Sequence, residues 1–318
     1  MRVDGWLAGL TCVLLATFVV ACRGSGGDGA VVTIGGSTAP AHAPVASPTQ
    51  PGTPVPPPDV IFSETSASQD SAILVSVVGD ISGGSITFIN RQYNLTQGSQ
   101  SMYAFIGVGA DDAAGTYPAK IDFTLKGGSK GSISQPLTVA PTRWPSDAVN
   151  VPPSLVPLLD PAVQSAETAQ LGQFYGGFTP QKLWSGPWLM PVQGPVTTHF
   201  GEQRSYNGGS VSGHHSGTDL GSDLGTPVVA TNSGKVVMAR QLRVHGNMVV
   251  IDHGGGVYSG YAHLSSFAAA EGQAVKAGDI IGYVGNTGLS TGAHLHWEMS
   301  VGGVLVDPIK FTDGTDGF

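Results

Sequence analysis

The segment STGAHLHWEM, residues 290–299, decides how the C-terminal half of this chain folds. It places His294 and His296 on either side of Leu295. Successive side chains of a β-strand project to opposite faces, so the two imidazoles lie on one face, about 7 Å apart along the strand. Leu295 then points into a core on the other face. The segment therefore predicts a strand that presents two histidines to one small site.

The composition of the whole chain favours a mainly β fold. The chain has 318 residues, 41% of them hydrophobic, with 47 glycines and 22 prolines. This length allows about two domains, and no long amphipathic helical pattern is present. Short strands separated by frequent turns are therefore expected. In the C-terminal half, the β-type runs are residues 225–240, 247–264, 277–285 and 293–301.

Residues 59–142 alternate in the manner of short strands. This spacing, with Gly/Asp-rich turns, predicts an Ig-like β-sandwich. The stretch contains neither histidine nor cysteine, so we expect a structural or binding module rather than a catalytic one. The expected strands are residues 72–79, 84–89, 102–109, 119–127 and 134–140, and the expected turns are DISGG (80–84), DDAAGTYP (111–118) and KGGSKG (126–131).

The N-terminus has the pattern of an exported lipoprotein. An apolar run from Trp6 to Ala21 is short for a membrane span of about 20 residues, and it fits the apolar core of a signal peptide. It ends in VVAC, which resembles a bacterial lipobox with Cys22 as the lipidated residue. We therefore expect a signal peptide over residues 1–22 and a lipid-anchored protein in the cell envelope, on the periplasmic face or the cell surface. A plain signal peptide and an uncleaved anchor are the alternatives.

Two linkers separate the expected parts. Residues 23–58 are rich in Gly, Ser, Ala, Thr and Pro and contain no aromatic residue, so we expect a disordered tether. Residues 143–183 form a linker with one helix, for which Asp160 is the expected N-cap and Pro161 the first helical residue. Gly176 and Gly177 are expected to end that helix, which we interpret as a connector.

The histidines gather in the C-terminal part, where eight of the nine follow residue 198. His215 and Asp219 are four residues apart, and the intervening Ser-Gly-Thr favours a loop leading into a strand over a helix. Imidazole and carboxylate together suit zinc, although a surface His–Asp hydrogen bond is the simpler alternative. His263 lies in a third β-type run. The only cysteines are Cys12 and Cys22, so any metal site in the body of the protein must use histidine and carboxylate.

Taken in order, these motifs resemble the LytM/lysostaphin family of zinc metallopeptidases, which cut peptide bonds in bacterial peptidoglycan. The resemblance covers roughly residues 184–311 and includes GTPVVATNSGKVV, GNMVVIDHGGGVYSGYAHLS, GQAVKAGDIIGYVGNTG and AHLHWE. It implies an antiparallel β-sheet peptidase domain over residues 184–318. The preceding sandwich resembles the accessory domain that often comes before such peptidases.

The resemblance also implies a role for each matched residue. His215, Asp219 and His296 would bind one zinc ion per chain, while His263 and His294 would be catalytic. Three protein ligands leave a fourth tetrahedral position open, as catalytic zinc requires. Water activated there is a nucleophile near pH 7, and a histidine can accept its proton.

The remaining residues near these motifs receive lesser roles. His214 is not in the H-x-x-x-D register, and we expect His199, His245 and His253 to be structural or on the surface. Arg204 and Tyr206 lie just before the ligand motif and are candidates to line the substrate groove. The substrate would be a stem peptide or a cross-bridge of peptidoglycan.

Three alternatives compete with the endopeptidase. A serine hydrolase is suggested by GLSTG around Ser290, but that motif needs a turn from a strand into a helix, and a strand-like run follows here. A catalytically silent activator of other cell-wall hydrolases would have the same fold. A wall-binding lipoprotein would use the sandwich alone. The net charge of −8 and the absence of a basic cluster exclude a nucleic-acid partner.

Overall fold

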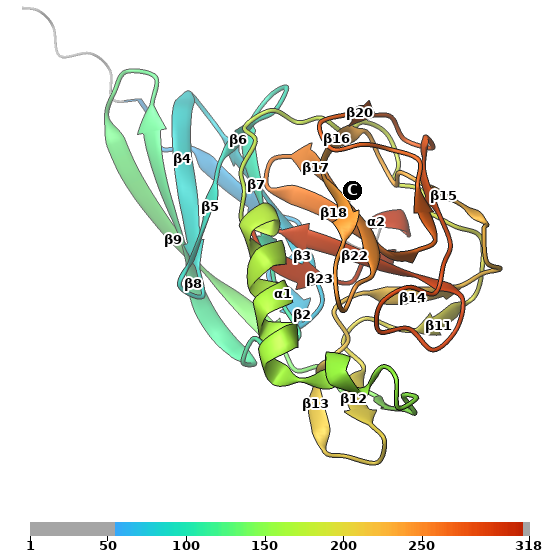
Figure 1. Cartoon of the computed structure of the whole chain (residues 1–318). Helices are drawn as coiled ribbons and strands as arrows, with labels where there is room; N and C mark the ends of the chain where they lie inside the picture. Colours follow the sequence, from blue (N-terminus) through green and yellow to red (C-terminus); the bar gives the residue numbers. More distant parts are fainter. Residues whose placement is uncertain (1–54, 314–318) are drawn as a thin grey trace, which may run out of the picture. The chain divides into compact units, whose positions relative to one another are not determined.

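The computed structural model describes residues 55–313, so Cys22, the predicted signal peptide and nearly all of the predicted tether lie outside the described residues. Within residues 55–313, no helix is long and apolar enough to cross a membrane. The described chain is mainly β with antiparallel sheets, as predicted (Figure 1).

Residues 59–140 form two sheets that enclose one apolar cluster, and we call this part the two-sheet module. Its core contains Val75 and Ile106 from one sheet and Ile86, Ile121 and Leu137 from the other. An Ig-like topology stays a prediction. The first sheet has the order β1 (Asp59–Phe62), β3 (Ala72–Val78), β7 (Met102–Gly107), β6 (Thr96–Gln97), and the second β2 (Ser66–Ser68), β9 (Lys130–Ala140), β8 (Gly115–Leu125), β4 (Ile81–Phe88), β5 (Arg91–Asn94).

The turns of this module are shorter than the sequence predicts. β4 begins at Ile81, inside the expected turn DISGG, and β8 begins at Gly115, inside DDAAGTYP. Gly84 lies in a strand because the adjacent strand approaches closely: an added Cβ would lie 2.3 Å from the carbonyl oxygen of Asp122. Glycine therefore marks a close backbone approach here and not a turn.

The C-terminal part is built on one large antiparallel sheet. β22 lies between β14 and β18, which places its two histidines near the middle of the sheet (Figure 1). Leu295 is fully buried in the core on the opposite face, as expected. The sheet order is β11 (Val196–Thr198), β14 (Thr218–Gly221), β22 (His294–Val301), β18 (Val257–Leu264), β17 (Asn247–Gly254), β16 (Gly234–Gln241), β20 (Ala274–Val275).

Smaller elements surround this sheet. β23 (Val304–Val306) pairs with β22, and the short helix α2 (Ile309–Thr312) follows it. One three-stranded sheet has the order β15 (Pro227–Val229), β21 (Ile280–Tyr283), β19 (Ser266–Phe267), and another β10 (Ser146–Val149), β12 (Gln203–Tyr206), β13 (Val211–His214). β10 belongs to the predicted linker and pairs with β12 in parallel.

The predicted helix is α1 (Pro161–Tyr175), preceded by a 3-10 turn, η1 (Val156–Leu159). The Asp160 side chain accepts a hydrogen bond from the backbone N–H of Ala162 at 2.8 Å, and Gly176 is the C-cap, as expected. The role of α1 as a connector stays a prediction, and the helix also packs against the large sheet. Leu171 and Tyr175 pack with Met238, Met248 and other residues of the large sheet in one apolar cluster.

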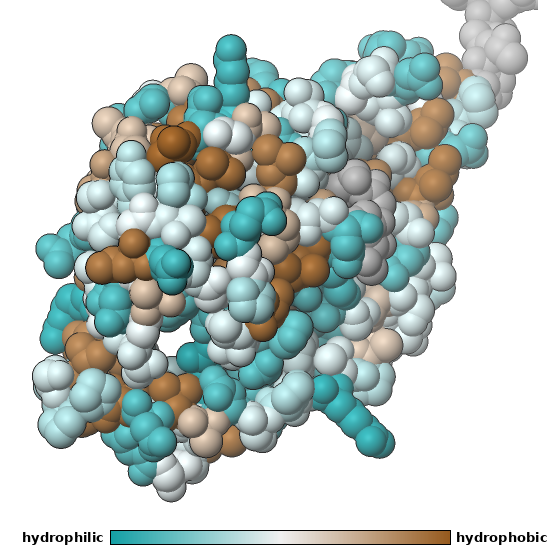
Figure 2. All heavy atoms as spheres, turned by 90° about the vertical axis from the view of Figure 1, so that its right-hand side faces the viewer, coloured by the Kyte–Doolittle hydropathy of each residue, from teal (hydrophilic) through white to brown (hydrophobic). Residues whose placement is uncertain are grey.

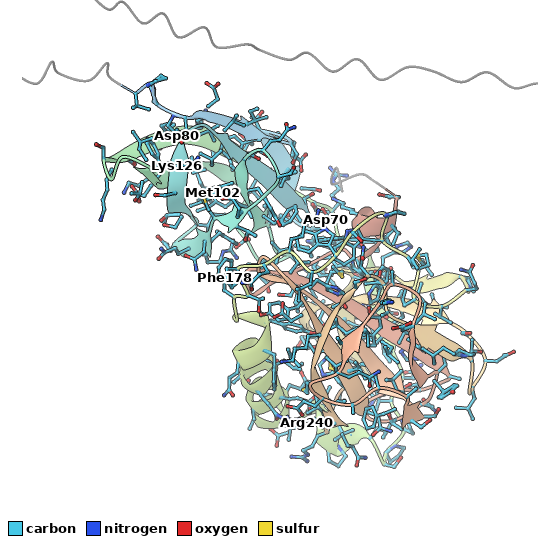
Figure 3. The ribbon with its side chains drawn as sticks, turned by 90° about the horizontal axis from the view of Figure 1, so that it is seen from above. Asp70, Asp80, Met102, Lys126, Phe178 and Arg240 are labelled. Carbon is cyan, nitrogen blue, oxygen red and sulfur yellow. The ribbon has the colours of Figure 1, made fainter. Side chains whose placement is uncertain are left out.

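The two-sheet module and the C-terminal part share an apolar core. Tyr103 and Phe105 of β7 belong to the same cluster as Trp184 and Val304, and the Tyr103 and Trp184 rings lie 6.3 Å apart edge to face. Beside this cluster, the Lys310 ammonium donates at 2.6 Å to the carboxylate of Asp70, which is labelled in Figure 3. On the face shown in Figure 2, hydrophobic side chains form small groups among hydrophilic ones.

Candidate metal centre

Strand pairing brings three of the predicted site residues together. β14 and β22 are antiparallel with Asp219 directly opposite His296, and His215 stands just before β14. The backbone of Gly217 passes close to β22, where an added Cβ would lie 2.4 Å from the Trp297 carbonyl oxygen. Glycine at this point lets the loop bring His215 over the strand, as the expected loop-to-strand arrangement requires.

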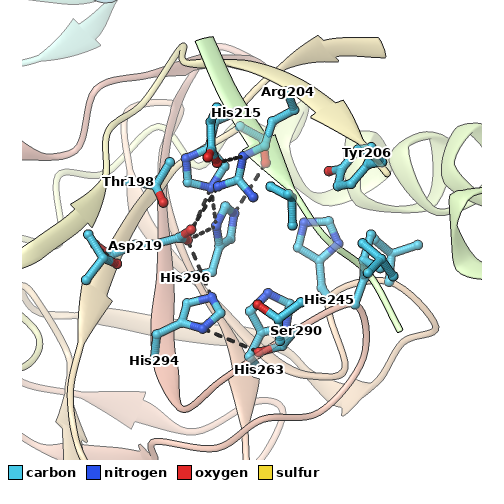
Figure 4. A pocket seen from close by; sticks show the side chains of 18 of the residues that line it. Thr198, Arg204, Tyr206, His215, Asp219, His245, His263, Ser290, His294 and His296 are labelled. Atoms are coloured by element: carbon cyan, nitrogen blue, oxygen red, sulfur yellow. Dashed lines mark hydrogen bonds and ion pairs between the residues drawn. The ribbon is translucent and has the colours of Figure 1, made fainter. Parts of the chain in front are cut away.

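The three side chains present a compact triangle of ligand atoms (Figure 4). Asp219 Oδ1 lies 2.8 Å from His296 Nδ1 and 3.1 Å from His215 Nε2. The two ring nitrogens are 3.0 Å apart. All three residues are buried. Edges of about 3 Å leave a point roughly 2.1 Å from every corner, which matches zinc–nitrogen and zinc–oxygen bonds.

The hydrogen bonds behind this triangle fit a cation at that point. His215 Nδ1 lies 3.0 Å from the His199 carbonyl oxygen, so it carries the proton and leaves Nε2 bare. His296 Nε2 lies 3.1 Å from Glu298 Oε1, which leaves its Nδ1 bare in the same way. Two nitrogen lone pairs and a carboxylate oxygen then face one another. These three acceptor atoms repel one another, and a divalent cation bound between them removes the repulsion.

The electrostatics of the triangle agree. Burial raises the pKa of Asp219, but the neighbouring His215 and His296 outweigh it and hold the pKa well below its usual value. Burial lowers the pKa of His215, which keeps the imidazole neutral. Burial lowers the pKa of His296, but the Asp219 and Glu298 carboxylates outweigh it and raise the pKa above its usual value.

His263 and His294 stand beside the triangle. Their rings are 4.9 Å apart, and His294 Nε2 lies 3.6 Å from Asp219 Oδ1. Each Nδ1 donates to a backbone carbonyl, of Thr287 at 2.8 Å for His263 and of Gly292 at 2.9 Å for His294. This tautomer leaves each Nε2 as an acceptor. Burial lowers the pKa of His263 well below its usual value, helped by the neighbouring His294 and His296.

The backbone at His263 is held in a rare conformation. Its φ is +60°, in the left-handed region, although it is not a glycine. Two contacts fix it: its N–H donates to the His245 carbonyl at 2.9 Å, and an added Cβ at the adjacent Gly285 would lie 2.4 Å from its carbonyl oxygen. A non-glycine residue in this region is typical of functional sites.

A groove of about 610 Å³ opens over these side chains. Arg204 and Tyr206, the candidate groove residues, both line it, and Arg204 also contacts the triangle: its guanidinium donates to Asp219 Oδ2 at 2.9 Å. Asp147 of β10 contacts the same guanidinium at 3.3 Å. Residues 147–151 of the predicted linker therefore form part of the groove wall.

Sequence analysis missed a layer of residues behind His296. His245, expected to be structural or on the surface, lies between two carboxylates, with Nδ1 2.7 Å from Glu167 Oε1 and Nε2 3.2 Å from Glu298 Oε1. Together with His296 and Glu298 it forms a second group of possible ligand atoms. The spacing of Glu167, Leu171 and Tyr175, the buried residues of α1, could have indicated that this helix face is buried.

The other histidines and Ser290 lie outside the triangle. His214 contacts Asp111 at 2.9 Å, His199 is exposed, and His253 is buried, with Nε2 2.7 Å from Ser259 Oγ. Ser290 lies in a loop before strand β22, and its hydroxyl donates to Asn286 Oδ1 at 2.6 Å. The turn from a strand into a helix that a serine hydrolase needs is therefore absent around Ser290.

The region that holds this site is similar in sequence to a known peptidase family. Residues 213–308 match the model of peptidase family M23. The DD-carboxypeptidase/endopeptidase Mpg of Neisseria meningitidis is 45% identical over 96 residues, which are 30% of this chain and 22% of that protein. The murein hydrolase activator NlpD of Salmonella dublin is 35% identical over 125 residues, which are 39% of this chain and 31% of that protein. The chain thus spans less than a third of the length of these relatives.

A crystal structure of a peptidase M23 from Pseudomonas aeruginosa resembles a larger part of the chain. It is 25% identical and superposes with a TM-score of 0.55, covering 73% of this chain and 88% of that one. This share is larger than residues 184–318 alone, so the likeness extends beyond the region that carries the site.

Proposed function

Since residues 213–308 form a peptidase family M23 domain, we propose that this chain is a zinc-dependent endopeptidase that hydrolyses peptide cross-links of bacterial peptidoglycan. One observation carries the proposal: two further histidines, His263 and His294, stand beside the ligand triangle of His215, Asp219 and His296, each oriented by a hydrogen bond from Nδ1 to a backbone carbonyl. A site that only binds a metal has no use for two further oriented imidazoles.

The five residues divide into two roles. His215, Asp219 and His296 would hold the zinc, which supplies a Lewis acid and a nucleophile at neutral pH when bound. His294, which lies nearest the Asp219 carboxylate, would accept the proton of the attacking water at Nε2. His294 would then return this proton to the leaving amine, and the neutral His263 would hold the attacking water in place by accepting a hydrogen bond at Nε2.

The surrounding chain orients the substrate. The groove has walls from both the predicted linker and the β12–β13 hairpin, so a peptide can lie along it and reach the triangle. Arg204 holds Asp219 Oδ2 and leaves Oδ1 as the ligand atom. We propose that stem peptides or cross-bridges of peptidoglycan occupy the groove, in line with the names of the relatives Mpg, an endopeptidase, and NlpD, a murein hydrolase activator.

A catalytically silent activator is the second candidate, because the relative NlpD is named a murein hydrolase activator. The arrangement of side chains favours the enzyme. An activator needs neither the ligand triangle nor the two further oriented imidazoles of His263 and His294.

We further propose that the protein is exported, cleaved before Cys22 and anchored to a membrane through a lipid on that cysteine. VVAC at residues 19–22 supports this location, as does a substrate in the cell wall. The two-sheet module, residues 59–142 in the predicted boundaries, would serve as an accessory domain. Residues 23–58 would act as a tether that lets the enzyme reach the wall.

Two neighbouring substitutions test the proposal. His296→Ala removes one of three metal bonds, so zinc content and peptidoglycan cleavage should fall together. His294→Ala leaves all three bonds, so zinc should remain while the rate falls by about 10²–10⁴-fold. The matched control is Arg240→Ala, which removes an exposed cation paired with Glu271 and should change neither quantity.

Metal analysis and mass spectrometry of digested peptidoglycan are the measurements. Zinc-loaded protein that cleaves nothing but stimulates another wall hydrolase would favour the activator. If His294→Ala loses zinc and His296→Ala keeps it, the two roles are reversed.

A further inference from the structure

Helix α1 lies outside the region that matches peptidase family M23, yet it places two polar side chains behind the ligand triangle. Its buried residues are Glu167, Leu171 and Tyr175, spaced four apart on one face of the helix. Leu171 packs against the large sheet, whereas the other two make polar contacts. An acid and a phenol in the buried stripe of a helix need a specific reason, because burying polar groups is costly unless they are hydrogen-bonded.

Glu167 holds the loop between β16 and β17. Its Oε2 accepts hydrogen bonds from the backbone N–H groups of Arg243 and Val244 at 2.7 and 2.8 Å. Its Oε1 accepts from the backbone N–H of His245 at 2.8 Å and from its Nδ1 at 2.7 Å. One carboxylate thus fixes three consecutive residues and the orientation of one imidazole.

His245 connects Glu167 to Glu298 by a hydrogen bond from each of its ring nitrogens. Both of its ring nitrogens face carboxylate oxygens, so both must carry protons. Burial lowers the pKa of His245, but Glu298 and Glu167 outweigh it and raise the pKa to about 10. The imidazolium therefore sits as a fixed double donor between the helix and strand β22.

Glu298 then contacts the candidate metal ligand. Its Oε1 lies 3.1 Å from His296 Nε2 and accepts from Ser216 Oγ at 2.8 Å. Its Oε2 accepts from the Tyr175 hydroxyl at 2.6 Å. Gly260 leaves room for this second contact, because an added Cβ would lie 2.3 Å from the Tyr175 hydroxyl oxygen.

We infer that Glu167, His245 and Glu298, with Tyr175, are positioning residues that fix the ring orientation and tautomer of His296 for the metal. The inference rests on the proposed role of His296 as a ligand. A carboxylate behind a ligating histidine raises the basicity of the ring and holds it in place. Here that carboxylate is itself held by a helix that lies 38 residues or more before the matched region.

A second cation between His245, His296 and Glu298 is the competing interpretation, because their ligand atoms lie within 4.8 Å of one another. The contacts disfavour it. Both nitrogens of His245 are committed as donors, and Glu298 Oε1 already accepts three hydrogen bonds. A cation there would have to displace these protons from a fully hydrogen-bonded network.

The test compares Glu167→Gln and His245→Gln with the wild-type full-length chain. Glutamine at 167 turns an N–H₂ group toward backbone donors and breaks the first link. Both variants should bind Zn²⁺ about 10–100-fold more weakly in competition with a chelator. The double variant should be little weaker than either single one, because both changes interrupt the same chain of contacts. Glu271→Gln, at an exposed ion pair, is the matched control and should leave the affinity unchanged.

Cobalt(II) provides a readout that a purely structural role would not move. The visible absorption bands of the Co²⁺-substituted protein report ligand geometry and should shift in both variants but not in the control. Lower stability with unchanged Zn²⁺ affinity and unchanged Co²⁺ bands would overturn the inference. A stoichiometry of two Zn²⁺ ions per chain, falling to one in His245→Gln, would also overturn it.

Two further variants keep the outcome clear. If Glu167→Gln does not fold, Tyr175→Phe removes only the hydrogen bond to Glu298 Oε2 and should weaken Zn²⁺ binding in the same direction. Unchanged affinity in Tyr175→Phe would then count against the network. Failure of the proposed function looks different: His296→Ala would retain Zn²⁺, whatever Glu167→Gln does.

Discussion

Destabilising the two-sheet module should also destabilise the part of the chain that holds the metal centre. Tyr103 and Phe105 of the module are buried in the apolar cluster that contains Trp184 and Val304. Burying one large apolar side chain contributes roughly 1.5–3 kcal/mol, so the two aromatic residues couple the parts by about 3–6 kcal/mol. Loss of the module would expose this aromatic surface and remove that contribution from the C-terminal part.

Leu137→Ala is the sharpest perturbation. Leu137 is fully buried in the core of the module and has no place in the shared cluster. Its truncation costs about 2–5 kcal/mol, a large share of the roughly 5–15 kcal/mol that stabilises a folded protein. If the parts unfold together, the same loss should be reported by probes outside the module.

Tryptophan fluorescence during urea unfolding is that probe, because residues 59–142 contain no tryptophan. The tryptophans of the described residues are Trp144, Trp184, Trp188 and Trp297. We expect the free energy of unfolding from this signal to fall by about 2–5 kcal/mol in Leu137→Ala. Ile61→Ala, at a side chain of the module that is 57% exposed, should change it by less than about 0.5 kcal/mol.

The result that refutes this reasoning is a tryptophan transition unchanged in Leu137→Ala, together with an earlier, separate transition in the circular dichroism of the β-sheets. The module would then be an independent domain, and the shared cluster would contribute little.

Two other predictions concern pH and location. Burial lowers the pKa of His253 from 6.5 to about 4. Between these two pH values, His253 is therefore protonated in the unfolded chain and neutral in the folded chain. Stability should then rise with pH from about 4 to 6.5, and the His253 contribution should amount to about 3 kcal/mol. Urea unfolding of metal-free protein should show a flatter pH profile for His253→Gln, and parallel profiles would contradict the assignment. Cys22→Ala should release the protein from the membrane fraction, whereas retention there would indicate an uncleaved anchor.

Local patterns were sufficient to predict the strand that carries His294 and His296 and the loop before Asp219. Alternation alone placed His294 and His296 on one face with Leu295 in the core, because side-chain direction in a strand depends only on parity. The loop before Asp219 followed from the poor helix propensity of Ser-Gly-Thr. The antiparallel register that puts Asp219 opposite His296 joins residues 77 positions apart, and it entered the sequence analysis only through the family resemblance.

The residues that sequence analysis missed depend on packing between distant elements. His245 was assigned no role because its partners, Glu167 and Glu298, lie 78 and 53 residues away. Arg204 was placed in the groove, but its contact with Asp219 requires β12 to run beside the ligand loop. The expected turn at residues 80–84 lies mostly in strand β4, because Gly84 allows the adjacent strand to approach closely. Each error comes from a contact whose two sides have no common local pattern.

The boundary of the matched family region therefore differs from the boundary of the candidate metal centre and the contacts behind it. Residues 213–308 contain all three candidate ligands and both candidate catalytic histidines. They lack Glu167, whose carboxylate holds three backbone N–H groups and one imidazole. Without α1, the buried His245 would keep only Glu298 as a charged partner, and a buried charge that loses a partner is strongly destabilising. The candidate ligands and the contacts behind them thus come from separate stretches of the chain, and a fragment of residues 213–308 would carry the candidate ligands without Glu167 and Tyr175.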